Sequence, residues 1–349
     1  MSKIIKRIVK GFMRLKVLLV NPTFGGVSGS GRHVKLLYER LKDKVEFEVW
    51  NVGSVGFINL PKLKTISFYL KCKLKKIPDD VDIIHVHNSK LAGIISENKT
   101  SILTIHGSYE EELEIQYGSL IAPVKWYIRR NLRNADVITC VDPYTADRMN
   151  WIWIPNMVDL ELIESIKGMK DEPKLIWIGR DDPVKNHELF RLIAKEVYRR
   201  FKVKSLVLGI RRGKYQEHEW ISYERVPWEM VISYLKNSYA LVVTSKIEGL
   251  PSIILEAWAS GCPVIAPPIK SLSMLNRLFG EVIKLTENYE VESFLRYIKL
   301  AIDGELGDIV KRSKEIVSSR FDSRIVSEEY LKLYHEILNQ AKNTTSRGA

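Results

Sequence analysis

Short apolar segments alternate with segments of helical periodicity along most of this 349-residue chain. The apolar segments are rich in β-branched residues and have few polar positions, which is typical of strands buried on both faces of a parallel sheet. Strands separated by helices predict doubly wound α/β sheets. The strands are expected over residues 16–21, 45–52, 83–87, 101–105 and 137–141, and then over residues 174–179, 205–209, 240–244 and 264–267.

The length of the chain exceeds what one hydrophobic core usually organises, so two domains are expected. Turn residues gather at residues 157–173, between the two sets of strands. We therefore predict two Rossmann-like domains that face each other across a cleft. The predicted segments are a basic extension at 1–15, a first domain at 16–160, a second domain at 161–322, a final helix at 323–342 and a disordered tail at 343–349.

Positive charge is concentrated at the start of the chain. Residues 1–76 contain 17 Lys or Arg and 4 Asp or Glu, a net charge of +13, which leaves −1 for the remainder of a chain whose total is +12. Such asymmetry suggests an anionic partner, either a nucleic acid, a phosphate-bearing substrate or a lipid surface. A solvated, self-repelling surface is the alternative interpretation.

Two basic segments carry this excess. Residues 1–14 form an amphipathic stretch that either lies on an anionic membrane or is an extension upstream of a start at Met13. Residues 62–76 form a second candidate helix, whose apolar stripe is expected to pack on the first sheet while its lysines face outward, towards an anionic leaflet. That stripe consists of Leu63, Ile66, Leu70 and Leu74.

The cysteines and the hydropathy argue against a disulfide-linked, zinc-binding, membrane-spanning or secreted protein. Cys72, Cys140 and Cys262 are scattered and form no C-x-x-C pair, so we expect reduced buried thiols and neither disulfides nor a zinc site. No apolar run is long enough to cross a membrane, and no secretory signal is visible. We expect a cytoplasmic protein, either free or peripheral on the inner face of the cell membrane.

Residues 245–266 are the most informative segment. The strand at 240–244 leads into Glu248 on a loop, and then into a helix that is expected to begin at Ser252, a good N-cap residue, and to place Glu256 in its first two turns. Both carboxylates then face the crevice beyond the strand ends, where open α/β sheets bind ligands. The free amides of such a helix start suit a phosphate.

A second loop carries two cations. Arg180 and Lys185 lie between the strand at 174–179 and a helix that begins near His187. Two cations on one strand-to-helix loop suit a diphosphate.

The segment at 245–266 resembles the E-x7-E signature of retaining glycosyltransferases with the two-domain GT-B fold, family 4 (group 1) in particular. That family has Glu-Gly-x-Pro followed by Glu-Ala-x-Ala-x-Gly-x-Pro-Val, and this chain has both in the same order. The resemblance extends over most of residues 16–340. It implies metal-independent transfer of a sugar from a nucleoside diphosphate sugar to a hydroxyl acceptor, and a final helix that crosses back to the first domain.

The same resemblance implies the catalytic residues. Arg180 and Lys185 match the pair that binds the donor diphosphate and stabilises it as the leaving group. Glu248 would lie against the donor sugar. His106, after a strand of the first half, would contact that sugar across the cleft.

The donor-binding residues are also implied by the resemblance. Glu256 would accept hydrogen bonds from the ribose hydroxyls, for which a carboxylate with two charged acceptor oxygens is suited. Main-chain atoms would serve at the remaining positions, towards phosphate, sugar or base. These positions are Gly249, Leu250, Ser252, Gly26 and Val226.

No metal ligands and no cofactor are expected. Asp80 and Asp82 formally match a D-x-D motif but immediately precede a strand, so we reject them. His85 and His87 share a strand face and their spacing lacks a third ligand, so we interpret them as structural or lining the cleft. One departure from the family is a Ser-Leu-Ser-Met-Leu segment at 271–275, where a glycine pair and a glutamate are usual.

The expected partners are a nucleotide-sugar donor, a glycan or lipid-linked acceptor, and an anionic membrane that contacts residues 1–76; nucleic acid is not expected. Two alternatives remain, because a fold does not fix a function. One is a catalytically silent binding subunit, and the other is a nucleotide-sugar epimerase or phosphorylase with the same fold.

Overall fold

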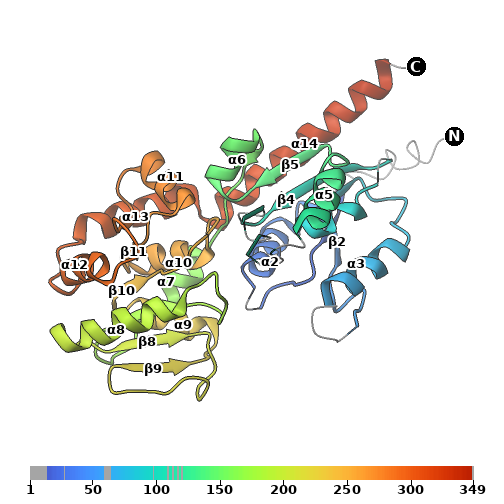
Figure 1. The fold of residues 1–349 in the computed structure, drawn as a ribbon. Helices are drawn as coiled ribbons and strands as arrows, with labels where there is room; N and C mark the ends of the chain where they lie inside the picture. Colours follow the sequence, from blue (N-terminus) through green and yellow to red (C-terminus); the bar gives the residue numbers. More distant parts are fainter. Residues whose placement is uncertain are drawn as a thin grey trace. The chain divides into compact units, whose positions relative to one another are not determined.

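The computed structural model describes residues 14–26, 28–58, 64–96, 98–107, 110–111, 114–115, 118 and 121–347, with side chains to residue 341 (Figure 1). The basic stretch at 1–13 and residue Leu63 lie outside the described residues. The chain divides into two compact units. The first contains the described residues of Met1–His106, Ala122–Thr139 and Ser327–Ala349, and the second those of Gly107–Ile121 and Cys140–Val326.

The first sheet has six strands in the order β2-β1-β3-β4-β5-β6. The pairs β1–β2, β1–β3 and β3–β4 are parallel, and the side chains of β3 are all buried, as its apolar sequence predicts. The strands are β1 (Leu15–Val20), β2 (Val45–Trp50), β3 (Ile83–Val86), β4 (Thr100–Ile105), β5 (Val137–Cys140) and β6 (Ile152–Trp153).

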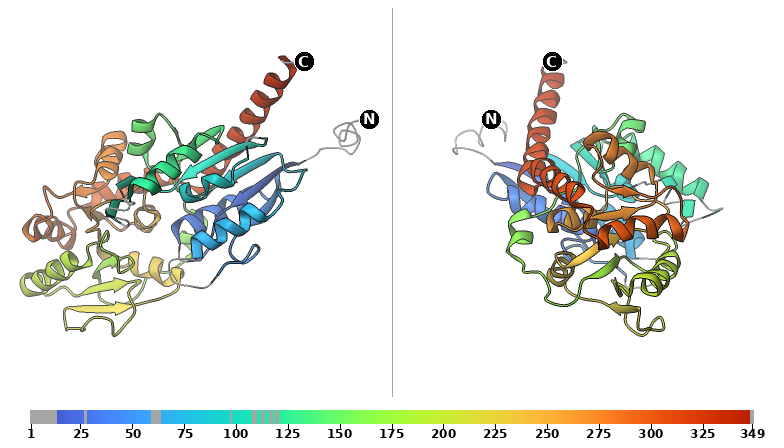
Figure 2. Two further views of the ribbon diagram at one scale, coloured as in Figure 1. Left: turned by 45° about the vertical axis from the view of Figure 1, so that its right-hand side comes forward. Right: turned by 90° about the vertical axis from the view of Figure 1, so that its left-hand side faces the viewer.

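Helices cover both faces of this sheet. His33 of α2 and His85 of β3 both contact the ring of Tyr330 in α14, so α2 and α14 share one face. Tyr69 of α3 contacts Tyr127 of α5 on the other face. From Ser327 onward α14 belongs to the first unit, which confirms the predicted crossover, and its last turns extend to the C-terminus (Figure 2). The bounds are α2 (Gly29–Leu41), α3 (Lys64–Leu74), η1 (Ser89–Ile94), α5 (Ile121–Leu132) and α14 (Ser323–Arg347).

The second sheet is parallel throughout, with the strand order β12-β11-β10-β7-β8-β9. Successive residues of β10 point to opposite cores: Ala240 packs with one apolar cluster and Leu241 with the other. Burial on both sides explains why this strand is apolar at successive positions. The strands are β7 (Lys174–Ile178), β8 (Ser205–Leu208), β9 (Ile221–Glu224), β10 (Ser238–Val242), β11 (Val264–Ala266) and β12 (Lys284–Leu285).

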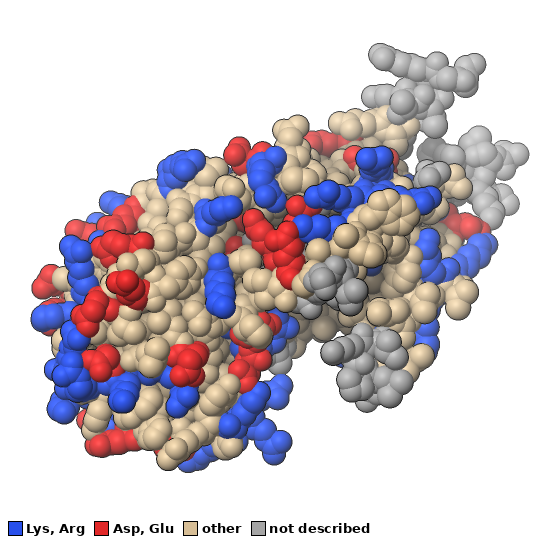
Figure 3. Space-filling model, in the orientation of Figure 1, with Lys and Arg blue, Asp and Glu red and all other residues tan. Residues whose placement is uncertain are grey.

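Two helices, α8 (His187–Phe201) and α12 (Val291–Ile302), pack on one face of the second sheet. The other face is covered by α7 (Leu160–Ser165), α9 (Trp228–Leu235), α10 (Ser252–Ser260), α11 (Lys270–Phe279) and α13 (Gly307–Arg320). A further short helix, α6 (Pro143–Met149), is capped by Asp142. Acidic and basic side chains are intermingled on the visible surface of this unit (Figure 3). The two sheets and their helices confirm the predicted fold of two Rossmann-like domains.

The structure corrects the prediction for α3. Ile66, Leu70 and Leu74 are 55%, 54% and 89% exposed, so the apolar stripe does not pack on the sheet. The buried side of the helix instead carries Phe68 and Cys72. Helical spacing correctly identified that Ile66, Leu70 and Leu74 share one side of the helix. Phe68 and Cys72 are also four residues apart and form a second apolar side. This second side faces the core, which the large Phe68 ring fills.

Candidate active site

The second sheet reverses its strand order between β7 and β10. The chain leaves β7 towards β8 on one side, and leaves β10 towards β11 on the other. The loops that follow β7 and β10 therefore diverge and open a crevice at the carboxyl ends of the strands. Arg180 and Lys185 lie on the first loop, and Glu248 and Gly249 on the second.

Lys185 and Glu248 form an ion pair across this crevice, between Nζ and Oε1. Their side chains are 22% and 10% exposed, so solvent can reach the ammonium while the carboxylate is nearly enclosed. The Ser245 hydroxyl donates a hydrogen bond of 2.6 Å to Glu248 Oε1. The Ser271 hydroxyl donates one of 2.7 Å to the Glu248 carbonyl oxygen. Glu248 is therefore fixed at its side chain and at its main chain.

Further hydrogen bonds join the two loops. The Lys246 amide donates to the Val184 carbonyl at 2.8 Å, and the Thr244 hydroxyl donates to the Lys185 carbonyl at 2.9 Å. The indole N–H of Trp177, on β7, in turn donates to Thr244 Oγ1 at 2.9 Å. These bonds hold the main chain of Lys185 in place, so its ammonium is positioned before a ligand arrives.

Arg180 does not join this pair. Its side chain is 81% exposed, and its guanidinium lies 3.4 Å from Asp182 Oδ2. Arg180 and Lys185, which the sequence analysis assigned to one diphosphate site, therefore have different surroundings on this loop. One is held by a carboxylate in the crevice, and the other extends into solvent.

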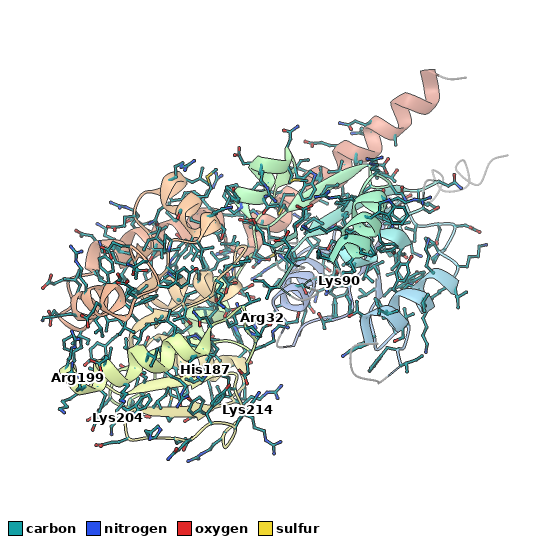
Figure 4. The ribbon with its side chains drawn as sticks, in the orientation of Figure 1. Arg32, Lys90, His187, Arg199, Lys204 and Lys214 are labelled. Carbon is teal, nitrogen blue, oxygen red and sulfur yellow. The ribbon has the colours of Figure 1, made fainter. Side chains whose placement is uncertain are left out.

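The loop that follows β8 packs against the loop that follows β7. Asp181 forms an ion pair with Lys214 and accepts a hydrogen bond of 3.0 Å from the Tyr215 hydroxyl. These donors, Lys214 first, lower the pKa of the Asp181 carboxyl. The Tyr215 ring lies 4.8 Å from that of His187, and Figure 4 shows His187 and Lys214 at the same end of the unit. The sequence interpretation missed this loop, although its basic turn at 211–214 follows a predicted strand.

The start of α10 differs from the prediction in one respect. The N-cap residue is Pro251, and Ser252 is the first helical residue, so Ser252 does not cap the helix. No side chain caps this terminus. The Ile254 amide donates to the Pro251 carbonyl at 3.0 Å, and the amides before it, at Ser252 and Ile253, are the ones that suit a ligand. Glu256 lies in the second turn with 3% of its surface exposed, and Gly261 ends the helix in the left-handed conformation.

The loop before α10 is tightly packed. A Cβ on Gly249 would lie 2.5 Å from the Cα of Gly107, so only glycine fits there. Leu250 is buried, and its carbonyl accepts a hydrogen bond of 2.6 Å from the Asn156 side chain. Val226, half-buried between β9 and α9, packs against the adjacent core.

In the first unit, Gly26 lies in the loop after β1 with φ of 74°, and open space surrounds the position of a Cβ. Asp80 and Asp82 bind Lys16, at its ammonium (2.7 Å) and its amide (2.8 Å) respectively. These contacts give the two carboxylates a structural role at the start of β1.

The histidines of the first unit depart from expectation. His106 is half-buried, and its Nε2 lies 3.2 Å from Nδ1 of His87. His33, from α2, brings a third imidazole to this pair. The argument that no third ligand exists was therefore wrong for His87. Sequence spacing could not reveal His33, which is 54 positions away and lies on the buried side of its helix.

His85 has different surroundings. Its Nδ1 lies 2.7 Å from the Tyr334 hydroxyl, and its Nε2 lies 2.7 Å from Thr104 Oγ1. Burial lowers the pKa of His85 to about 3 and also lowers that of His87. Both imidazoles are therefore neutral at pH 7, and His85 joins α14 to the sheet, as its structural interpretation predicts.

Two family models match successive parts of this chain. The model of Glycosyltransferase Family 4 matches residues 27–162, and that of Glycosyl transferases group 1 matches residues 160–317. The chain is 26% identical over 292 residues to an uncharacterized glycosyltransferase of Methanocaldococcus jannaschii, covering 74% of this chain and 80% of that protein.

A second relative is the UDP-Gal:alpha-D-GlcNAc-diphosphoundecaprenol alpha-1,3-galactosyltransferase of Escherichia coli. It is 27% identical over 286 residues, covering 71% of this chain and 72% of the relative. Among solved structures, sucrose-phosphate synthase of Thermosynechococcus elongatus has a similar fold, with a TM-score of 0.75 at 17% identity over 94% of this chain and all of that one. Within the described residues, no helix has the length and apolar character needed to cross a membrane.

Proposed function

We propose a specific reaction for this chain, which belongs to the group 1 family of GT-B glycosyltransferases. The chain transfers a sugar from a nucleoside diphosphate sugar to a hydroxyl of a lipid-linked glycan. The transfer retains the anomeric configuration of the sugar. Glycosyltransferase activity follows from the family. The observation that carries the finer proposal is the Lys185–Glu248 ion pair at the switch point of the second sheet.

The donor diphosphate would bind at this pair. A diphosphate brings more negative charge than one carboxylate, so it can attract the Lys185 ammonium, which remains 22% exposed. Arg180, exposed on the same loop, can fold onto the diphosphate from solvent and add a bidentate contact. The amides at the start of α10 would supply further donors.

Glu256 and Val226 would position the nucleoside. The Glu256 carboxylate offers two acceptor oxygens to vicinal ribose hydroxyls, and its burial strengthens such bonds. Main-chain atoms near Val226 would contact the base. Because the E. coli relative uses UDP-Gal, UDP is the first nucleotide to test.

The proposed chemistry needs no metal ion at the diphosphate. As the bond from the anomeric carbon to the leaving oxygen breaks, negative charge grows on the diphosphate, and Lys185, Arg180 and the α10 amides stabilise it. A leaving phosphate oxygen takes the proton of the acceptor hydroxyl, and the acceptor oxygen bonds to the anomeric carbon on the same face of the sugar, which preserves the anomeric configuration. Glu248 keeps Lys185 in place, and both Glu248 and His106 would contact the sugar.

A lipid-linked acceptor is supported by α3. Its exposed Ile66, Leu70 and Leu74 form an apolar row beside Lys71 and Lys73. Apolar side chains flanked by lysines suit the headgroup boundary of an anionic membrane. The E. coli relative, by its name, acts on a diphosphoundecaprenol-linked sugar.

Substitution of Arg180 tests the proposal with a matched control. Arg180→Ala should lower kcat by about 100-fold, because a cation that stabilises the leaving group is lost. Arg199→Ala, on the same unit but at the far end of α8 (Figure 4), should leave kcat unchanged. Equal turnover by the two variants would reject the role of Arg180 at the diphosphate.

A further inference from the structure

Three imidazoles converge at the end of the first sheet. His33 lies on the helix that follows β1, His87 directly follows β3, and His106 directly follows β4. One ring nitrogen of each lies within 4.8 Å of the others. Because β1 and β3 are neighbours while the chain leaves β1 towards β2, this cluster lies at the switch point of the first sheet, a usual place for ligands.

The spacing of the nitrogens is close to that of a metal site. Zn²⁺ binds imidazole nitrogens at about 2.0–2.1 Å in a tetrahedron, which separates two ligand nitrogens by about 3.4 Å. The distance between His87 Nδ1 and His106 Nε2 is 3.2 Å. The three ligand nitrogens lie within 4.8 Å of one another, so no separation in the cluster exceeds the tetrahedral value by more than about 1.4 Å.

The surroundings distinguish these imidazoles from a structural histidine. Hydroxyls contact both ring nitrogens of His85, which lies beside the cluster. His87, by contrast, is 1% exposed, and its Nδ1 faces Nε2 of His106 instead of a hydroxyl. Two neutral imidazole nitrogens that face each other can share one proton as a hydrogen bond, or both can bind one metal ion.

We propose that His33, His87 and His106 form a three-nitrogen site for a divalent transition-metal ion, with Zn²⁺ as the first candidate. Imidazole ligands select Zn²⁺ and its neighbours over Mg²⁺ and Ca²⁺, which prefer oxygen. Three protein ligands leave the fourth tetrahedral position open. His106 is the most exposed of the three, so this position can open on its side.

One consequence rests on the proposed function. His106 cannot offer the same nitrogen to a metal ion and to the donor sugar. Zn²⁺ at the cluster would therefore slow transfer, and removing Zn²⁺ with a chelator would restore it. The metal ion would act as an inhibitor rather than as a catalyst.

Binding is tested with Co²⁺, whose visible absorption reports the ligand number, on the full chain without a histidine tag and after chelator treatment. His33→Gln and His87→Gln are compared with His335→Gln, which alters an exposed histidine of α14. We expect one four-coordinate Co²⁺ that Zn²⁺ displaces, and a loss of affinity of about 100-fold or more in the first two variants only.

Circular dichroism confirms that each variant is folded before the comparison. Absence of a four-coordinate spectrum in the wild-type chain would overturn the site. Equal Co²⁺ affinity in all the folded variants would overturn it too. Metal binding without inhibition of transfer would support the site but reject the contact of His106 with the donor sugar.

Discussion

Replacement of Lys185 by methionine isolates the contribution of its ion pair with Glu248. Methionine keeps an unbranched apolar stem but removes the ammonium, so the Glu248 carboxylate, 10% exposed, keeps the Ser245 hydroxyl and loses its cation. Removing one partner of a fully buried pair costs about 3–5 kcal/mol, whereas exposed pairs contribute about 0–1 kcal/mol. With one partner 22% exposed, we expect a loss of about 1–3 kcal/mol for Lys185→Met.

The assay is thermal unfolding of four proteins: the wild type, Lys185→Met, Glu248→Gln and the double variant. A loss of 1 kcal/mol lowers the Tm of a domain of this size by about 2–4 °C. Glu248→Gln should restore part of the Tm lost in Lys185→Met, because it removes the charge that Lys185 balanced, but should not restore transfer. Lys299→Met breaks an exposed pair with Asp303 and should change Tm by less than about 2 °C. Strictly additive changes in the double variant would refute the coupling.

Three further predictions concern the nucleotide, the loop and the membrane. Glu256→Ala should weaken UDP binding by at least about tenfold in calorimetry, because a charged hydrogen bond to ribose is lost; unchanged affinity would exclude that role. Gly249→Ala should lower both Tm and turnover, because its Cβ would overlap the Gly107 backbone, while Gly307→Ala, with open space around it, should change neither. Leu70→Glu should reduce flotation with anionic vesicles at low salt, and equal flotation of the variant and the wild type would remove α3 from the contact.

The central strands could be predicted because burial on both faces imposes an uninterrupted apolar run. The residues of β3 and β8 are all buried, and the sequence located both strands to within one residue. Three strands at sheet edges were missed. In β9 the residues alternate between buried and half-buried, and β6 and β12 contain two residues each. None of these strands therefore has the uninterrupted apolar run that identifies a central strand.

The local parts of the site were also predictable, since turn and helix signals act over a few residues. The loop with Glu248 and the helix with Glu256 lie where the sequence placed them. The N-cap was predicted one residue too late, at Ser252. Pro251 occupies that position instead, because its fixed φ and missing N–H are tolerated at a helix start.

Contacts between distant segments were not predictable from one sequence. Lys185 and Glu248 are 63 positions apart, and no periodicity indicates that they pair. The contact of Asp181 with Lys214 and the approach of His33 to His87 depend likewise on strand order. Strand order follows from packing of the whole sheet, to which local propensities contribute little.

The central claim, sugar transfer from a nucleoside diphosphate donor, is tested most directly by UDP release from UDP-sugars with and without an acceptor. The acceptor is a diphosphoundecaprenol-linked sugar in anionic vesicles. We predict UDP release only when the acceptor is present, and about 100-fold slower release by Lys185→Met. Release at the same rate without acceptor would indicate hydrolysis or epimerisation, and binding of UDP-sugars without any release would indicate a silent subunit; either result would contradict the proposed transfer.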